Sequence, residues 1–405
     1  MIRTYFPNFL ISNLNSDRNI IDMEYQRIEK SLFFLLPLFL IMSAVKATDI
    51  SSCGYAINSS GEYFVTQNLT APPNTCIVVN SDDVILDCQG YSLIGSGLGY
   101  GIEDYSQNTT IRNCNIIDFD NGMVIGNESL VQNNFISTSS SYGIDMVRGN
   151  NIIEDNIIID ISDTSIAVYT DNNTIRNNTL LGTNIGIGLV VGNDEAINNI
   201  IEDNTFSGFD SGQAIYFETV ENNTIRNNVF YGSELYLYEN VQYNHFYNNL
   251  FNGTVITLDT ALFNYWNTTK QSGTRIYSDG AEIGGNYWTN PTFTDFSDNC
   301  ADSETDGFCD LNLTLDSNNI DFLALSDEYV APTTTTTTTA PTTTTTIPEF
   351  QTTTSFNILI LVPLVMLIFI IYGFYRKEQK TVNDLMILAF MVIIVIFFAV
   401  IIYSL

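Results

Sequence analysis

The chain has 405 residues and a formal net charge of −31, because 45 Asp and Glu residues stand against 14 Lys and Arg residues. So acidic a surface repels phosphate backbones, which disfavours a nucleic-acid partner. Cysteines occur at positions 53, 76, 88, 114, 300 and 309. An even number of cysteines in an exported chain indicates disulfides.

The beginning of the chain fits a leader, residues 1–47. Residues 31–45 are apolar, lie between two lysines and are too short to span a membrane without tilting. They match the apolar region of a signal peptide, with Val45 and Ala47 at the small-residue positions of a cleavage site. The alternative is an uncleaved N-terminal anchor, and Met23 is a second candidate for the start of translation.

Two apolar runs close the chain, and residues 356–375 and 385–405 are predicted to be transmembrane helices. Each is long enough to cross a hydrocarbon core of ~30 Å. The loop between them, 376–384, contains three basic residues, which mark it as cytoplasmic. We therefore predict an integral membrane protein of the cell membrane with an extracellular ectodomain.

Residues 331–355 contain runs of threonine interrupted by three prolines. This composition has too little apolar surface to fold. It predicts a disordered, O-glycosylated stalk, with a flexible unmodified linker as the alternative.

Between residues 81 and 265 the chain repeats a short unit, Ile-x-Asn/Asp-Asn. The copies begin at Ile85, Ile111, Val131, Ile153, Ile175, Ile201, Ile225 and Phe246, which are 20 to 26 residues apart. Each copy is followed by a second apolar run, so each coil needs at least two strands. This period predicts an all-β fold, a right-handed parallel β-helix whose coils stack at ~4.8 Å.

The predicted organisation has eight parts. They are the leader (1–47), an N-terminal cap (48–80), the β-helix repeats (81–290), an acidic Asp-Gly loop region (291–330), the stalk (331–355), the first membrane helix (356–375), the cytoplasmic loop (376–384) and the second membrane helix (385–405).

Equivalent positions of the repeat form rows along the stack. The fourth position reads Cys88, Cys114, Asn134, Asn156, Asn178, Asn204, Asn228 and Asn249. Because stacked amides can bond one another from coil to coil, the six asparagines predict an asparagine ladder at a turn. The second position alternates in charge sign, which favours exposed ion pairs over a ligand-binding stripe.

The sequence predicts three disulfides, Cys53–Cys76, Cys88–Cys114 and Cys300–Cys309. Cys88 and Cys114 hold the same position in consecutive coils, so their Cα atoms should lie ~4.8 Å apart, within the range of a disulfide. The last pair brackets an acidic loop. The first pair then remains, and would hold the N-terminal cap on the first coil.

The repeat resembles the parallel β-helix superfamily, in particular NosD-type proteins and related archaeal surface proteins. The resemblance covers roughly residues 50–325 and includes Leu86-Asp87-Cys88-Gln89-Gly90 and the closing Gly284-Gly285-Asn286-Tyr287-Trp288. It implies the fold but no single activity, because the superfamily includes lyases, hydrolases, epimerases and adhesins. NosD itself is associated with copper-site maturation, so the resemblance taken alone would imply copper handling. This chain has one histidine, His245, which is predicted to be structural, and no Cys/His/Met cluster.

Residues 302–310 read Asp-Ser-Glu-Thr-Asp-Gly-Phe-Cys-Asp. They match the start of an EF-hand-type loop, although its bidentate glutamate is missing. We predict a structural Ca²⁺ bound by Asp302, Glu304, Asp306, Asp310 and the Phe308 carbonyl. The alternative is a solvated acidic turn without an ion.

No catalytic constellation stands out in the sequence. Candidates for a glycosidase-like acidic cluster are Asp118, Asp120, Asp145, Asp160 and Asp163. Candidates for a sugar-stacking strip are Tyr216, Phe217, Tyr236 and Tyr238, of which strand alternation should bury half.

Ten Asn-x-Ser/Thr sequons occur, and the preferred glycosylation acceptors are Asn58, Asn68, Asn267 and Asn312.

Together these features predict a membrane-anchored surface protein that is structural in the cell envelope or binds glycans. Its expected partners are envelope glycans or surface proteins. The alternative is an extracellular polysaccharide lyase or glycoside hydrolase of the β-helix type.

Overall fold

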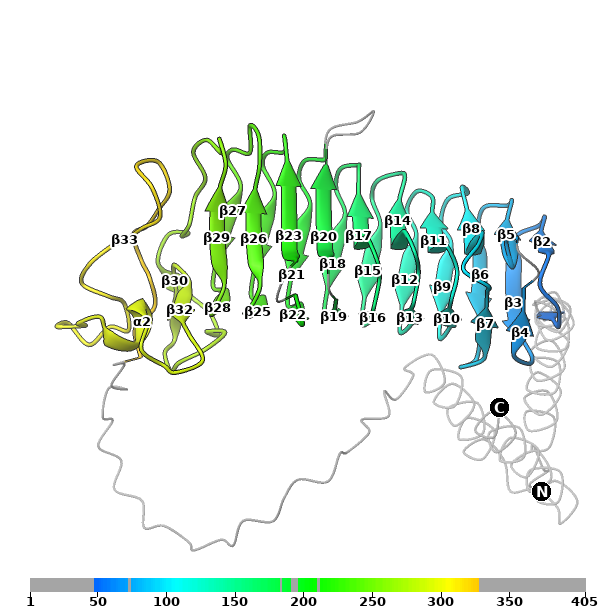
Figure 1. The fold of residues 1–405 in the computed structure, drawn as a ribbon, viewed down its shortest axis with the longest axis horizontal. Helices are drawn as coiled ribbons and strands as arrows, with labels where there is room; N and C mark the ends of the chain where they lie inside the picture. Colours follow the sequence, from blue (N-terminus) through cyan, green and yellow to red (C-terminus); the bar gives the residue numbers. More distant parts are fainter. Residues whose placement is uncertain (1–46, 72–73, 183, 191–195, 210–211, 328–405) are drawn as a thin grey trace, which may run out of the picture. The chain divides into compact units, whose positions relative to one another are not determined.

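The computed structural model describes residues 47–71, 74–182, 184–190, 196–209 and 212–327. They wind into a right-handed parallel β-solenoid with three strands in each coil (Figure 1). The predicted all-β β-helix is therefore confirmed. The predicted stalk and membrane helices, and the leader up to residue 46, lie outside the described residues. Within the described residues, no helix is long and apolar enough to cross a membrane.

Three parallel sheets of ten strands run along the solenoid. Sheet A consists of β1 (Thr48–Ile50), β3 (Gly61–Val65), β6 (Val84–Asp87), β9 (Thr110–Arg112), β12 (Leu130–Gln132), β15 (Ile152–Glu154), β18 (Thr174–Arg176), β21 (Ile200–Glu202), β24 (Thr224–Arg226) and β27 (His245–Tyr247). Sheet B consists of β2 (Tyr55–Ile57), β5 (Ile77–Val79), β8 (Tyr100–Asp104), β11 (Asn121–Ile125), β14 (Tyr142–Met146), β17 (Thr164–Val168), β20 (Ile185–Val190), β23 (Gln213–Glu218), β26 (Glu234–Leu237) and β29 (Val255–Leu258). Sheet C consists of β4 (Leu69–Thr70), β7 (Ser92–Ile94), β10 (Asn115–Ile117), β13 (Phe135–Ser137), β16 (Ile157–Ile159), β19 (Thr179–Leu181), β22 (Thr205–Ser207), β25 (Val229–Tyr231), β28 (Leu250–Asn252) and β32 (Tyr287–Thr289).

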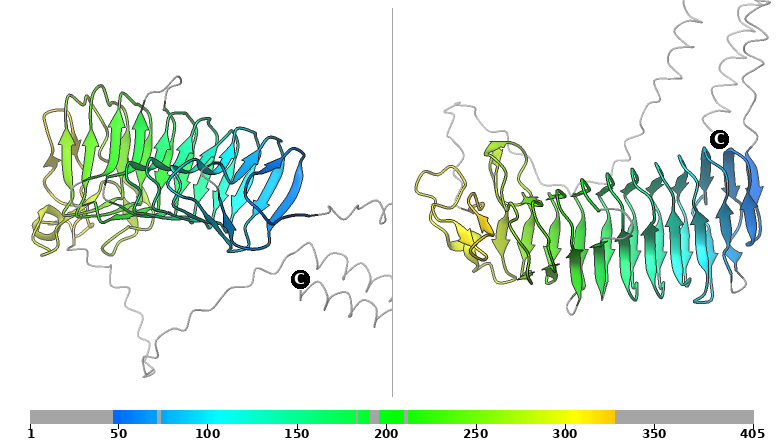
Figure 2. Two further views of the ribbon diagram at one scale, coloured as in Figure 1. Left: turned by 45° about the vertical axis from the view of Figure 1, so that its right-hand side comes forward. Right: turned by 90° about the horizontal axis from the view of Figure 1, so that it is seen from above.

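The sheets begin within residues 48–80, the segment predicted as the cap, because β1 to β5 already pair with later strands. Successive coils then follow one another along the axis (Figure 2). At the C-terminal end the chain adds the antiparallel pairs β30 (Gln271–Ser272) with β31 (Glu282–Ile283) and β33 (Leu313–Thr314) with β34 (Ile320–Asp321), and the short helix α2 (Phe296–Asn299).

The core is built from one inward residue per short strand. In sheet A this residue is the first of the repeat unit, and Ile111, Ile153 and Ile201 have no exposed surface. In sheet C the inward row becomes aromatic along the stack. The rings of Phe206 and Phe230 stack at 4.7 Å between centroids, and those of Phe230 and Phe251 stack at 5.1 Å. Burying one such side chain contributes roughly 1.5–3 kcal/mol, so the inward rows stabilise the solenoid along its whole length.

The third position of the repeat unit turns the chain from sheet A to sheet C. This residue has a positive φ in the copies that begin at Ile111 and beyond, as at Asn133 (56°), Asp155 (57°) and Asn177 (54°), whereas in the first copy the left-handed residue is Gln89. Asn and Asp adopt this left-handed conformation more readily than other non-glycine residues. The repeat unit is therefore the inward residue of sheet A followed by the corner that ends its strand.

The predicted asparagine ladder is confirmed at this corner. The Asn156 side chain donates to Asn178 Oδ1 at 3.0 Å, and the Asn178 side chain donates to Asn204 Oδ1 at 3.0 Å. Each Oδ1 also accepts the backbone N–H of the preceding asparagine, for example Asn156 N–H to Asn178 Oδ1 at 3.0 Å. The same bonds link Asn134, Asn156, Asn178, Asn204, Asn228, Asn249 and Asn286.

A second ladder, not predicted from the sequence, lies at the corner between sheets B and A. It consists of Asn151, Asn173, Asn199, Asn223, Asn244 and Asn264. Its amides are buried and bond at 2.9 to 3.1 Å from Asn173 to Asn264. Four of its members are the second residue of an Asn-Asn pair that directly precedes a strand of sheet A, and this was the signal available in the sequence.

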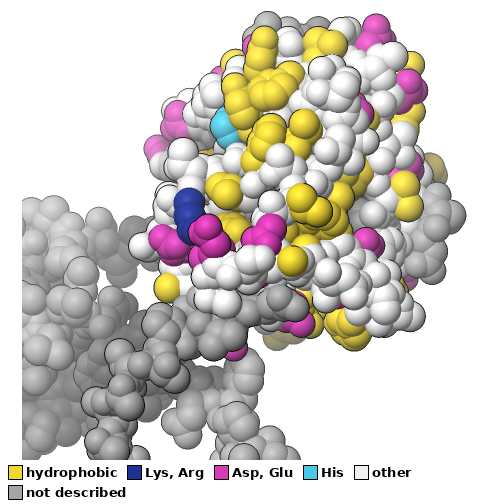
Figure 3. Space-filling view, turned by 90° about the vertical axis from the view of Figure 1, so that its left-hand side faces the viewer, with side chains coloured by type: hydrophobic (Ala, Val, Ile, Leu, Met, Phe, Trp, Pro, Cys, Tyr) yellow, Lys and Arg dark blue, Asp and Glu magenta, His cyan; other side chains and the backbone are white. Residues whose placement is uncertain are grey.

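Both ladders end on the segment 316–325. Asn319 Oδ1 accepts the N–H of Asn264 at 3.1 Å, and Asp321 Oδ2 accepts the N–H of Asn286 at 2.9 Å. Neither acceptor has exposed surface. Figure 3 views this end, where hydrophobic side chains remain visible among polar ones, and Val255 at the unpaired edge of sheet B is 61% exposed.

All three predicted disulfides are present in the structure. The Cα atoms of Cys88 and Cys114 lie 4.7 Å apart, and this pair stands at the start of the first ladder. The other two are Cys53–Cys76 and Cys300–Cys309. The register predicted for the first copy was wrong by one residue, because Leu86 rather than Ile85 pairs with Ile111 and points inward. The predicted ion pairs of the second row are present as Arg176–Glu154 and Arg226–Glu202. A third pair, Arg112–Asp87, was not predicted, because Asp87 was assigned to the third position.

Candidate functional site

The outer face of sheet B collects tyrosines from coils far apart in the sequence. We call this surface the tyrosine face; it consists of Tyr100, Tyr105, Tyr142, Tyr169, Tyr216, Tyr236 and Tyr238. Strand alternation explains the arrangement, because β23 points Tyr216 outward and buries its neighbour Phe217 completely. Of the predicted sugar-stacking strip, the three tyrosines therefore lie on this surface, and Phe217 belongs to the core.

Three rings at one end of the tyrosine face stack on one another. Tyr216 lies 5.7 Å from Tyr236 and 6.4 Å from Tyr238, with interplanar angles of 14° and 21°. The Tyr216 hydroxyl donates to Glu218, and the Tyr236 hydroxyl donates to Asp259 at 3.1 Å. Burial and the Glu218 carboxylate raise the pKa of Tyr216 to about 12, so its hydroxyl stays protonated.

Asp145 lies in the middle of sheet B, on the same outward row as Tyr216. In register it pairs with Val124 on one side and Ala167 on the other, and both of these outward side chains are nearly buried. Asp145 Oδ1 is buried and accepts no hydrogen bond from any described residue. Burial raises the pKa of Asp145 to about 6. A carboxyl group with a free, desolvated oxygen therefore stands among tyrosines.

Beside Tyr105, a groove of about 450 Å³ follows the corner between sheets B and A. Its lining is polar apart from the Tyr105 ring and consists of Asp82, Tyr105, Ser106, Gln107, Asn127, Arg148, Gly149, Asn150, Thr170 and Asp171. Arg148 is exposed and has no acidic partner among the described residues. Hydrogen-bonding groups, one cation and an aromatic ring thus adjoin the tyrosine face.

The five aspartates considered for catalysis do not converge. Asp118 and Asp160 follow strands of sheet C at positive-φ corners, whereas Asp120 and Asp163 precede strands of sheet B. Only Asp145 lies within a sheet face. Asp120 is bonded by Ser140 and Ser141, which is a structural use of the carboxylate.

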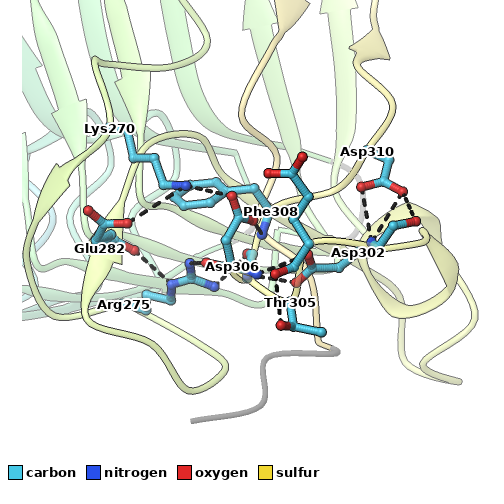
Figure 4. Close-up of polar contacts among 11 residues, drawn as sticks. Lys270, Arg275, Glu282, Asp302, Thr305, Asp306, Phe308 and Asp310 are labelled. Atoms are coloured by element: carbon cyan, nitrogen blue, oxygen red, sulfur yellow. Dashed lines mark hydrogen bonds and ion pairs between the residues drawn. The ribbon is translucent and has the colours of Figure 1, made fainter. Parts of the chain in front are cut away.

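The predicted calcium loop is held by contacts within the protein (Figure 4). Asp302 accepts the N–H groups of Asp306 and Gly307, Asp306 pairs with Lys270 at 2.6 Å, and Asp310 accepts from Ser303. Within the described residues, no three Asp, Glu, His or Cys side chains are arranged to hold a metal ion. An ion would have to compete with Lys270 for Asp306, and calcium binding stays a prediction.

His245 packs as a structural residue in the aromatic end of the solenoid. Its ring stacks on Tyr265 at 4.4 Å, and burial lowers its pKa. Of the preferred glycosylation acceptors, Asn58, Asn68 and Asn312 are exposed, whereas Asn267 is half-buried and its side chain donates to the carbonyl of Thr268. Their modification stays a prediction.

These features define a parallel β-helix protein with two asparagine ladders and an aromatic outer face. A family described as periplasmic copper-binding protein (NosD) matches residues 43–208 and 149–293, more than half of the chain. The chain therefore belongs to the NosD family. No curated protein matches it.

Among solved structures, the chain is similar to the tailspike protein of E. coli bacteriophage HK620 in complex with a pentasaccharide, at 12% identity and a TM-score of 0.37. The alignment covers 60% of this chain and 56% of the tailspike chain. A point mutant of the same tailspike gives a TM-score of 0.35 over the same shares. The chain thus spans little more than half of these tailspikes.

The described residues do not fit a copper ion. The six cysteine sulfurs are all in disulfides, so they are not free ligands. Met123 and Met146 are buried in the core, and His245 faces an aromatic ring. The described part of the chain therefore offers no set of free side chains that would hold copper.

Proposed function

We propose that this protein binds glycans outside the cell through the tyrosine face. The observation that supports this most directly is the stacked group Tyr216, Tyr236 and Tyr238 on an accessible sheet face. Tyrosine combines an apolar ring with a polar hydroxyl, which suits it to the apolar faces and hydroxyl groups of sugar rings. The adjoining groove adds amides, hydroxyls and Arg148, which would fix the orientation of a bound sugar.

We further propose that the solenoid is displayed at the cell surface by the stalk 331–355 and the membrane helices 356–375 and 385–405. Three disulfides support an oxidising compartment outside the cytoplasm. The leader, the threonine-rich segment and the basic loop 376–384 support the same orientation. Protease added to intact cells should remove residues 48–354, and protection of that region would contradict the orientation.

A glycan array probed with the full-length protein tests the binding proposal. Tyr236→Ala with Tyr238→Ala should weaken binding at least about tenfold, because sugar stacking on an aromatic ring is lost at two positions. Tyr91→Ala is the matched control, since Tyr91 is 37% exposed and lies outside the tyrosine face. An array without any bound glycan, or equal binding by the double variant, would refute the proposal.

A second candidate function, glycan hydrolysis, is favoured by Asp145. Glu103 occupies the same outward row two strands away, since Glu103 pairs with Val124 and Val124 pairs with Asp145. The two Cα atoms are therefore about 9.6 Å apart, at ~4.8 Å per strand. In inverting glycosidases the acid and base carboxyl groups lie roughly 6.5–9.5 Å apart, so Glu103 and Asp145 would have to lean slightly toward each other from this Cα separation. The raised pKa of Asp145 suits the acid.

Product analysis separates the two functions. Hydrolysis would release reducing ends from a bound glycan, and Asp145→Asn would stop the release while binding persists. Binding without release of reducing ends would exclude hydrolysis and leave the binding proposal intact.

A further inference from the structure

The outer face of sheet C lacks charge. The seven strands β7, β10, β13, β16, β19, β22 and β25 each point their first and third residues outward, and none of these fourteen residues is Asp, Glu, Lys or Arg. Eight of the fourteen are Ile, Leu, Val, Phe or Tyr. We call this surface the sheet C face.

The other two sheets differ. Outward positions of sheet A carry the ion pairs formed by Arg112, Arg176 and Arg226, and those of sheet B carry Glu103 and Asp145. In a chain with a net charge of −31, a sheet face of this length without a carboxylate needs a physical reason. Charged residues are depleted in the core of protein interfaces.

The sheet C face also exposes large apolar side chains. Ile157 is 46% exposed, Leu181 is 39% exposed and Tyr231 is 45% exposed. The C-terminal part of the chain covers one end of this face. There the outward residues Leu250 and Tyr287 are buried against Phe308 and Leu325. The protein thus buries Leu250 and Tyr287 of the last two strands, and Val229 of β25 packs partly against the same cluster, whereas Ile157, Leu181 and Tyr231 stay exposed.

We propose that the sheet C face binds a second copy of this chain in an isologous dimer. Two such faces meet without opposing charges, whereas every other sheet face would bring carboxylates of two acidic chains together. The corners beside the face hold Asp118, Asp155, Asp160 and Asp203. These aspartates lie at the exposed border of the contact, where they repel the aspartates of the second copy. Because salt screens this repulsion, association should strengthen as the ionic strength rises.

The size of the face sets the expected affinity. Seven strands at ~4.8 Å span about 29 Å, and with the width of a three-residue strand and its corners the face covers about 600 Å². Two copies would bury about 1,200 Å², at the lower limit of specific interfaces. The dimer is therefore weak and depends on protein concentration. Because β16 is the middle strand, a two-fold axis with full overlap places β16 against β16 of the second copy, with Ile157 opposite Ile157 or Ile159 of that copy.

Sedimentation of the full-length protein tests this inference. The wild type should dimerise reversibly and more tightly at higher salt. Ile157→Glu with Leu181→Glu places four carboxylates in the contact and should raise the dimer dissociation constant at least about tenfold. Val255→Glu is the control, because Val255 is also an exposed apolar strand residue but lies on sheet B.

A cysteine variant gives a test that does not depend on the stability of the charged variant. All six native cysteines are in disulfides, so Ile157→Cys adds a single free thiol. A short bifunctional thiol reagent should link two copies through position 157, and a Val255→Cys control should not be linked. A monomer at all concentrations, or a dimer that forms equally in the charged variant and is not linked through position 157, would overturn the inference.

Discussion

Replacing Asn178 by alanine should destabilise the solenoid far more than a change at its neighbour. Asn178 is 1% exposed and lies in the middle of the first ladder. Its Oδ1 accepts the backbone N–H and the Nδ2 of Asn156, and its Nδ2 donates to Asn204 Oδ1 and to the carbonyl of Ile153. Alanine removes both the acceptor Oδ1 and the donor Nδ2 of Asn178.

The magnitude follows from the groups that lose their partners. The Asn156 N–H has no other acceptor at that corner, and a buried donor left unpaired costs roughly 1–3 kcal/mol. The Ile153 carbonyl and the neighbouring amides lose net bonds of about 1 kcal/mol each. We expect a loss of about 3–4 kcal/mol in the free energy of unfolding.

Denaturant unfolding of the purified protein, followed by circular dichroism, measures this loss. The matched control is Asn177→Gly, because Asn177 is exposed and has a φ of 54° that glycine adopts freely. The control should change stability by less than about 0.5 kcal/mol. If Asn178→Ala costs no more than Asn177→Gly, the ladder does not stabilise the stack in the way described.

Three further outcomes are expected. Loss of the Cys88–Cys114 bond in a double serine variant should cost about 3.5 kcal/mol by chain entropy for a 26-residue separation, and an unchanged denaturation midpoint would contradict this. Burial raises the pKa of Asp321 to about 6, against the hydrogen bonds donated to it, so the stability contributed by its neutral form is present below pH ~4 and lost as the pH rises through about 6. Relative to Asp321→Asn, the wild type should therefore lose about 2 kcal/mol between pH 4 and pH 7, and parallel pH profiles would show that Asp321 is not the titrating group. Calcium should raise the melting temperature of the wild type but not of Asp306→Ala, and melting that ignores both calcium and chelator would exclude the proposed loop site.

The repeat unit explains why so much of the fold was predictable. Each copy combines an inward residue, a left-handed corner and a ladder amide within four positions, so one short pattern determines strand, turn and register. The disulfide Cys88–Cys114 was predicted correctly although the register assumed for its first coil was one residue off, since Leu86 and not Ile85 pairs with Ile111. The second ladder was harder to recognise because its residues, such as Asn173 and Asn223, stand among other asparagines at exposed corners.

The candidate site could be predicted only in part. Tyr216, Tyr236 and Tyr238 stood close enough in the sequence to be grouped, and the period of the strand showed that one of every two neighbours is buried. Asp145 lies on the same outward row of sheet B as Tyr216, but only the pairing of the strands shows this, because the corners between the strands differ in length. Because coils of 20 to 26 residues shift the outward rows of sheet B relative to the repeat unit, this alignment required the structure.

The two ladders also have a direction. Where one ladder amide donates to the next, the oxygen accepts from the preceding coil and the nitrogen donates to the following one, so the small dipoles add along the axis, as peptide dipoles do in an α-helix. The donor end of the first ladder meets the carboxylate of Asp321, which is the charge that such an end favours. A whole coil inserted between Asn134 and Asn249 would continue both rows and leave each end unchanged, whereas a partial coil would break them. The architecture therefore permits lengthening by duplication in units of one coil, with the terminal segment retained as a common stop.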